Sequence, residues 1–221
     1  PVDRDLGIDN DQYVAVLPGG FGKGGTLGSS VFIIDLENMA QQTESGVANY
    51  PGAIVSGSDG LIKIVDLDNT IEIDGSIFND VGNNITGDPV VITPDTFRGA
   101  KWRGAMVYVN DFEGKITKIN LTSDKKSGDG TEVNLFDYTT LFSLNANQEN
   151  ARYSYFGMDA AFGTDSRSLY LFGSTGDFGD IGSKTKGMDN ILYGIRDKDF
   201  PNFRLVNVGT VGSYLEAQSA S

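Results

Sequence analysis

Four aspartates near the start of the chain have the residue type of ligands for a hard cation. Asp3, Asp5, Asp9 and Asp11 stand in the stretch PVDRDLGIDNDQY. Carboxylate oxygens bind Ca²⁺, but calcium loops use a regular Asp-x-Asp-x-Asp-Gly frame that this stretch lacks, and Arg4 lies within it. The alternative interpretation is a solvated acidic terminus. The four aspartates are therefore candidate metal ligands without a regular ligand frame.

The second candidate site is a basic cluster in the middle of the chain. Arg98, Lys101, Trp102 and Arg103 stand in the stretch FRGAKWRGA, which contains the only tryptophan of the sequence. Guanidinium, ammonium and indole groups can clamp or stack on an anionic group of a partner. The alternative is an amphipathic loop that packs its indole against the protein surface.

The composition excludes several classes of function. The chain has no Cys and no His, which removes thiolate nucleophiles, His-based zinc sites and triads with an imidazole base. Its 30 acidic and 17 basic residues give a net charge of −13, which repels nucleic acids. No apolar stretch approaches the length of a membrane span. We therefore expect a protein that lacks much of the usual catalytic chemistry, binds no nucleic acid and does not span a membrane.

The apolar runs of the sequence have the length of β-strands. They contain about four to six residues, are rich in Val, Ile, Tyr and Phe, and are bounded by Gly, Asn, Asp and Ser. Helical periodicity is scarce, and we expect a loop followed by a strand over residues 134–156. The predicted strands are YVAVL, SVFIID, AIVSG, LIKIVD, PVVIT, MVYVN, KITKIN, LYLFG and ILYGIRD. The sequence therefore predicts an all-β protein.

Several of these runs form predicted hairpins with a shared plan. Glycine-bearing turns separate two strands at residues 19–28, 58–60 and 110–114. The second strand then ends in an apolar residue followed by Asp or Asn, at Asp35, Asp66, Asn120 and, more loosely, Asp197. Repeated antiparallel units of this kind are typical of β-propeller blades, with insertions between them. A β-sandwich of hairpins is the alternative.

Four stretches of the chain, in order, resemble one known family. They are Gly19 to Asn38, Val107 to Leu121 (VYVNDFEGKITKINL), Arg152 to Gly163 (RYSYFGMDAAFG) and Leu169 to Asp199. Together they resemble the C-terminal β-propeller of the PilY1/PilC family, the tip-associated adhesin and biogenesis proteins of bacterial type IV pili. The resemblance implies a quinoprotein-like β-propeller.

The resemblance also implies a location, partners and a role. Residues 1–221 are expected to form a single partial propeller with an incomplete set of blades, as the C-terminal part of a longer exported chain. Upstream sequence or a companion chain would complete it. The protein is expected at the bacterial cell surface, at the pilus tip or associated with the outer membrane. There it would contact pilins or minor pilins and surface or host receptors, supporting pilus biogenesis and adhesion without a required cofactor.

One feature of the family is altered in this sequence. The family commonly carries a calcium loop of the type Asp-x-Asp-x-Asp-Gly-x-x-Asp before the strand that Val107 begins here. This chain keeps only Asp95 in that place, surrounded by Arg98, Lys101 and Arg103. Positive charge opposes a bound dication. Calcium binding stays possible elsewhere in the chain, but the family site is not expected.

Two other functions fit the same predicted fold. The first is a quinoprotein-like propeller oxidoreductase. Such enzymes repeat a tryptophan motif and stack their cofactor on aromatic and disulfide surfaces, whereas this chain has one Trp and no Cys. The second is a structural blade module of a larger extracellular assembly.

Overall fold

The computed structural model describes somewhat more than half of the chain. The described residues are 2–3, 11–22, 28–36, 61–67, 83–93, 104–122, 125–126, 132–133, 135–144, 146, 150–164, 168–180, 182, 190–201 and 203. Their strands are β1 (Val2–Asp3), β2 (Asp11–Gln12), β3 (Val14–Pro18), β4 (Ser30–Asp35), β5 (Leu61–Asp66), β6 (Val90–Ile92), β7 (Met106–Asn110), β8 (Lys115–Asn120), β9 (Lys125–Lys126), β10 (Glu132–Val133), β11 (Tyr138–Ser143), β12 (Asp159–Phe162), β13 (Leu169–Ser174) and β14 (Leu192–Asp197). These residues contain one 3₁₀ turn, Phe178–Asp180, and no α-helix. No helix of the described part is long and apolar enough to cross a membrane.

The strands form three antiparallel sheets, each built from neighbouring segments of the chain. The N-terminal sheet has the order β3-β4-β5, the central sheet β6-β7-β8-β11, and the C-terminal sheet β12-β13-β14. Two short ribbons, β1-β2 and β9-β10, complete the pairings. Within the described residues no sheet closes on itself. The prediction of an all-β protein is confirmed for the described residues.

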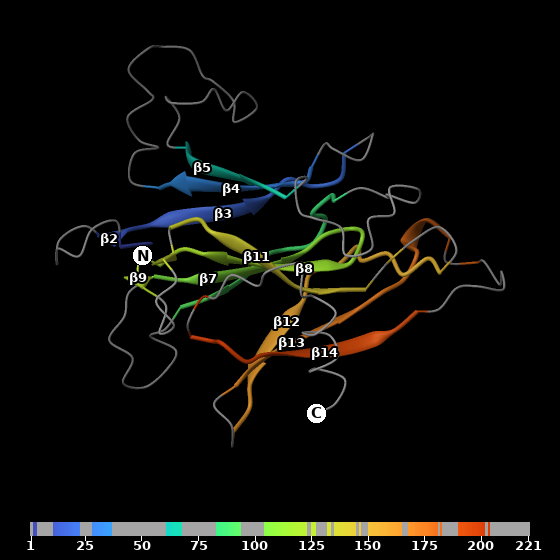
Figure 1. Ribbon diagram of the computed structural model, residues 1–221. Coiled ribbons are helices and arrows are strands. Elements are labelled where there is room, and N and C mark those ends of the chain that lie inside the picture. Colours follow the sequence, from blue (N-terminus) through green and yellow to red (C-terminus); the bar gives the residue numbers. More distant parts are fainter. Residues whose placement is uncertain are drawn as a thin grey trace, which may run out of the picture.

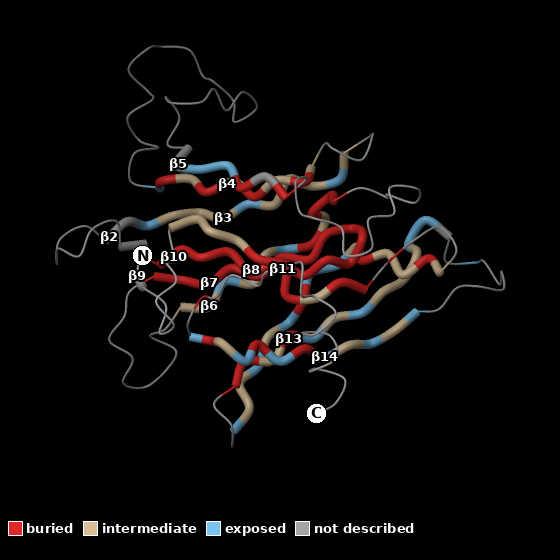
Figure 2. Tube along the Cα trace, viewed as in Figure 1, coloured by how far each residue is buried: buried red, intermediate tan, exposed pale blue. Residues whose placement is uncertain are grey.

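The three sheets stack in the order of the sequence, with the central sheet between the other two (Figure 1). Alternate side chains of a strand point to opposite faces, and β7 shows this directly. Val107 and Val109 belong to the core shared with the N-terminal sheet, which includes Val31 and Ile33. Met106 and Tyr108 belong to the core shared with the C-terminal sheet, which includes Leu169, Leu171 and Ile195. The two middle strands of the central sheet, β7 and β8, are therefore buried on both faces (Figure 2).

The Asp and Asn residues of the predicted repeat stand where strands end. Asp35, Asp66, Asn120 and Asp197 are the last residues of β4, β5, β8 and β14. Asn120 Oδ1 accepts a hydrogen bond from the backbone N–H of Thr122 at 3.0 Å. Asp197 Oδ1 accepts one from the N–H of Asp199, also at 3.0 Å. Side chains of this type compete with the sheet ladder for backbone groups, which ends the strand.

Two of the three predicted hairpins are present. β3 pairs with β4, with Val14 opposite Asp35, and β7 pairs with β8, with Asn110 opposite Ile116. The third prediction places a hairpin turn at residues 58–60, which lie outside the described residues. Its second strand is β5, which pairs with β4.

The prediction for residues 134–156 is wrong in part. Residues 138–143 form β11, an edge strand of the central sheet, where the sequence reading placed a loop. The Asn-rich sequence after Ser143 made the whole segment look like a loop. The Tyr-Thr-Thr run has high β-propensity and pairs with β8, and that pairing decides its structure. Residues 152–156 run irregularly, and β12 (Asp159–Phe162) follows within the stretch Arg152 to Gly163.

Candidate functional site

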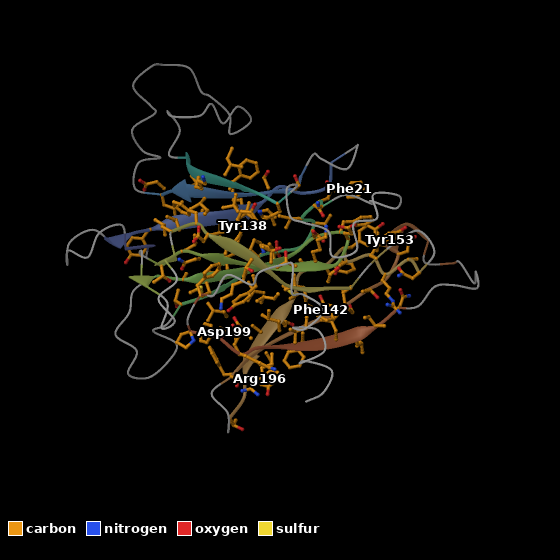
Figure 3. The ribbon with its side chains drawn as sticks, viewed as in Figure 1. Phe21, Tyr138, Phe142, Tyr153, Arg196 and Asp199 are labelled. Carbon is orange, nitrogen blue, oxygen red and sulfur yellow. The ribbon has the colours of Figure 1, made fainter. Side chains whose placement is uncertain are left out.

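Aromatic side chains from all three sheets gather where the turns of the sheets meet. We call this group the turn-end cluster; its members are Phe21, Phe112, Tyr153, Tyr155, Phe156 and Phe178. Phe21 follows β3, Phe112 lies in the turn between β7 and β8, and Phe178 follows β13. Figure 3 shows Phe21 and Tyr153 at the same end of the molecule. The cluster joins turns that are far apart in the sequence.

Phe112 is presented by a tight hairpin turn. The N–H of Gly114 donates to the carbonyl of Asp111 at 2.9 Å, and the N–H of Lys115 donates to Asp111 Oδ1 at 2.8 Å. Gly114 has a φ of 80°, a left-handed conformation that favours glycine. A Cβ at this position would also lie 2.7 Å from Cβ of Leu144. The turn therefore depends on both the aspartate and the glycine.

The rings of the cluster form an inner and an outer layer. Phe112 stacks almost flat on Tyr153, with centroids 4.7 Å apart and an interplanar angle of 4°, and it meets Tyr155 edge to face at 4.7 Å. The outer rings are those of Phe21, Phe156 and Phe178, whose side chains are 70%, 66% and 62% exposed. Large exposed apolar groups that gather on one surface indicate an interaction site.

The backbone under the cluster is tied together by residues 83–88. The N–H of Phe112 donates to the carbonyl of Asn84 at 2.7 Å, and the hydroxyl of Thr86 donates to the carbonyl of Tyr155 at 2.8 Å. Gly87 and Gly157 touch through their backbones, since a Cβ on Gly87 would lie 2.2 Å from the nitrogen of Gly157. The outer rings are thus carried on turns whose backbones are fixed to one another.

Asp177 adds a negative charge to the cluster. Its Oδ1 accepts hydrogen bonds from the N–H of Gly179 at 2.8 Å and from the hydroxyl of Tyr155 at 3.3 Å. Burial raises the pKa of Tyr155, and the charge and hydrogen bond of Asp177 raise it further. Burial and the same charge raise the pKa of Tyr153. The carboxylate therefore places negative potential over the rings.

A buried polar group lies beneath the same turn. Lys115 Nζ lies 2.6 Å from Glu113 Oε2. The side chain of Asn83, with its nitrogen toward the carboxylates, donates to Glu113 Oε2 and Asp111 Oδ2 at 3.0 Å each. Burial is the main cause that raises the pKa of Asp111 to about 8. Because these side chains are buried and satisfy one another, we interpret the group as an internal support for the turn.

The structure describes the backbone of two of the four predicted metal ligands. Asp3 and Asp11 lie opposite each other in the β1-β2 ribbon, whereas Asp5 and Asp9 lie outside the described residues. In the part of the chain that the structure describes, no three Asp, Glu, Cys or His side chains are grouped as metal ligands. Asp95, Arg98, Lys101, Trp102 and Arg103 also lie outside the described residues, so the basic cluster stays a prediction.

Sequence reasoning missed the turn-end cluster, although a signal for it is present. Its three exposed phenylalanines directly precede a glycine, as Phe21-Gly22, Phe156-Gly157 and Phe178-Gly179. A large aromatic side chain in a glycine-bearing turn is less easily buried than one in a strand. This recurrence marks turns that present a ring to solvent.

The chain was compared with protein-family models, with curated proteins and with solved structures, and no match was found in any of the three comparisons.

Proposed function

We propose that this chain is a blade-bearing part of a non-catalytic β-propeller protein of the bacterial cell surface. In this proposal it resembles the PilY1/PilC family and supports type IV pilus biogenesis and adhesion. Its partners are pilins or minor pilins and receptors on surfaces or host cells. No cofactor is required. The observation that carries the binding role is the turn-end cluster, in which the exposed rings of Phe21, Phe156 and Phe178 surround the buried Phe112 of the central sheet's turn.

Two features of the fold support the propeller part of the proposal. Each sheet is an antiparallel meander of neighbouring segments, which is the construction of a propeller blade. Consecutive sheets also pack face to face in the order of the sequence, through two separate cores. In a propeller, adjacent blades pack in this way, and the turns at one end of the blades form a common binding face.

The turn-end cluster supports binding rather than catalysis. Its described members are aromatic rings and one carboxylate, a set that supplies contact area but no nucleophile with an adjacent base. The buried carboxyl groups of Asp111 and Glu113 pair with Asn83 and Lys115 below the surface. Rigid scaffolds that carry exposed loop residues are the usual architecture of adhesive proteins.

The experiment that tests this function is deletion of the gene in the bacterium that carries it. We expect the deletion strain to show fewer pili, reduced twitching and reduced attachment, and the intact gene to restore all three. Normal piliation, twitching and attachment in the deletion strain would overturn the proposal. An absorption spectrum of the purified protein is a second test, since a visible quinone band would contradict a non-catalytic role.

A further inference from the structure

We propose that the turn-end cluster binds a lysine or arginine side chain of a basic partner segment, which rests on the exposed rings of Phe156 and Phe178 beside Tyr155 and the carboxylate of Asp177. This inference rests on the proposed function only in taking the cluster as a binding surface. It adds the chemistry of the bound group. The proposal is based on three observations: the angles between the rings, the fixed carboxylate of Asp177 and the net charge of the chain.

Phe178 lies against two other rings of the cluster, and both are inclined to it. The Phe178 centroid lies 6.2 Å from that of Tyr155, with the rings inclined at 56°, and 6.1 Å from that of Phe156, at 88°. Rings inclined in this way present faces in different directions. A cation binds within about 6 Å of a ring centroid, over the face. A guanidinium or ammonium group that rests on these exposed rings can therefore lie over the face of one ring and beside another.

Two of these rings are exposed and can be reached by a partner. Phe156 and Phe178 are among the most exposed large hydrophobic side chains of the described residues. Tyr155 is half-buried, and Phe112 packs against its ring from the inner side. Phe112 thus fixes the position of the Tyr155 ring, while the exposed rings of Phe156 and Phe178 can contact a partner.

The fixed carboxylate favours a cation over a neutral or anionic group. Asp177 is held beside Tyr155 and Phe178 by two hydrogen bonds, from the Tyr155 hydroxyl and the N–H of Gly179. The faces of aromatic rings are themselves negative. An anion would be repelled by the carboxylate and by the ring faces, and a neutral sugar would use only the ring faces.

The net charge of the chain favours a basic partner protein over a second copy of the chain. A net charge of −13 attracts basic segments and repels a second copy of the same chain. Aromatic rings with a carboxylate are also suited to the planar guanidinium, which stacks on ring faces and pairs with carboxylates. We therefore assign the site to a basic segment of another protein.

The test is an NMR titration of the protein with two short peptides. The probes are acetyl-Gly-Arg-Gly-amide and the same peptide with citrulline, which is nearly isosteric with arginine but uncharged. We expect the arginine peptide to shift the ring resonances of Tyr155, Phe156 and Phe178 and to bind at least about threefold more tightly than the citrulline peptide. Equal affinity of the two peptides would overturn the proposal.

Matched variants separate this site from general attraction to an acidic chain. Phe178→Leu and Asp177→Asn are each expected to reduce the preference for arginine by at least about twofold. The control is Phe172→Leu, which removes another exposed ring that stacks on Tyr170 instead. A preference for arginine that survives both site variants, or falls equally in the control, would overturn the proposal.

Failure of this inference can be distinguished from failure of the proposed function. If attachment of cells depends on the cluster but the purified protein binds a neutral oligosaccharide and shows no preference for arginine, the inference is wrong and the adhesive function stands. If the arginine preference holds and the deletion strain attaches normally, the inference stands and the proposed function is wrong.

Discussion

Replacing Lys118 with methionine should destabilise the protein strongly, because it leaves a buried carboxylate without its cation. Lys118 Nζ lies 2.6 Å from Asp197 Oδ2, and both side chains are only 1% exposed. The hydroxyl of Tyr108 donates to the same oxygen at 2.7 Å. The pair joins β8 of the central sheet to β14 of the C-terminal sheet. It therefore connects, together with Tyr108, two layers whose shared core is largely apolar.

The expected cost follows from the burial of the pair. Removing one partner of a buried ion pair costs about 3–5 kcal/mol, whereas replacing both partners with groups of similar volume is often nearly neutral. The double variant Lys118→Met/Asp197→Asn should therefore recover most of the stability that Lys118→Met loses. Asparagine keeps the oxygen that accepts hydrogen bonds from the N–H groups of Asp199 and Phe200, so the turn after β14 is preserved.

Urea denaturation of the wild type, both single variants and the double variant measures the coupling between the two side chains. Lys63→Met is the matched control, since Lys63 is an exposed lysine on β5, and its effect should stay within about 0.5 kcal/mol. The reasoning is refuted if Lys118→Met costs less than about 1 kcal/mol. It is also refuted if the double variant is less stable than Lys118→Met alone, beyond the error of the extrapolation.

Three further predictions concern pH, the turn and metal. In the folded state Asp111 has a pKa of about 8 and stays protonated up to that pH. In the unfolded chain the same carboxyl group loses its proton near pH 4. Its contribution to the unfolding free energy should therefore decrease as the pH rises from about 4 to 8. Asp111→Asn should flatten this dependence in urea denaturation at pH 5 and pH 8, and an unchanged slope would contradict the assignment. Gly114→Ala should cost about 1–3 kcal/mol because φ is 80° there, whereas Gly176→Ala, with open space around it, should be nearly neutral; equal effects would show that the turn tolerates a side chain. Calorimetric titration of the chelator-stripped protein with Ca²⁺ should show at most weak binding that Asp5→Ala removes, and a micromolar site lost in Asp95→Ala would contradict the prediction for that loop.

Local features of the fold could be predicted from the sequence because neighbouring residues determine them. The turn between β7 and β8 follows from an aspartate and a glycine three residues apart, and the ends of β8 and β14 follow from Asn120 and Asp197. Each of these structures depends on hydrogen bonds between residues at most four positions apart. The strands of the hairpins follow from β-branched and aromatic runs in the same way.

The site and the stacking of the sheets could not be predicted in this way. The partners of the turn-end cluster are far apart in the sequence, as for Phe21 and Phe112, and no local pattern places their turns side by side. The same holds for Lys118 and Asp197, which are 79 positions apart. The strand β11 was missed because its pairing with β8, rather than its flanking residues, decides its conformation.

Attachment of cells that produce a cluster variant tests the central claim most directly. The deletion strain is complemented with a gene that encodes the double variant Phe156→Ser/Phe178→Ser. Both substituted residues are exposed, so the variant should fold and reach the cell surface normally. We predict normal surface amounts and piliation, with attachment reduced by at least about tenfold relative to the wild-type gene, as expected when aromatic contact residues are lost. Attachment equal to that of the wild type, at equal surface amounts of the protein, would contradict the claim that these turns form the binding surface.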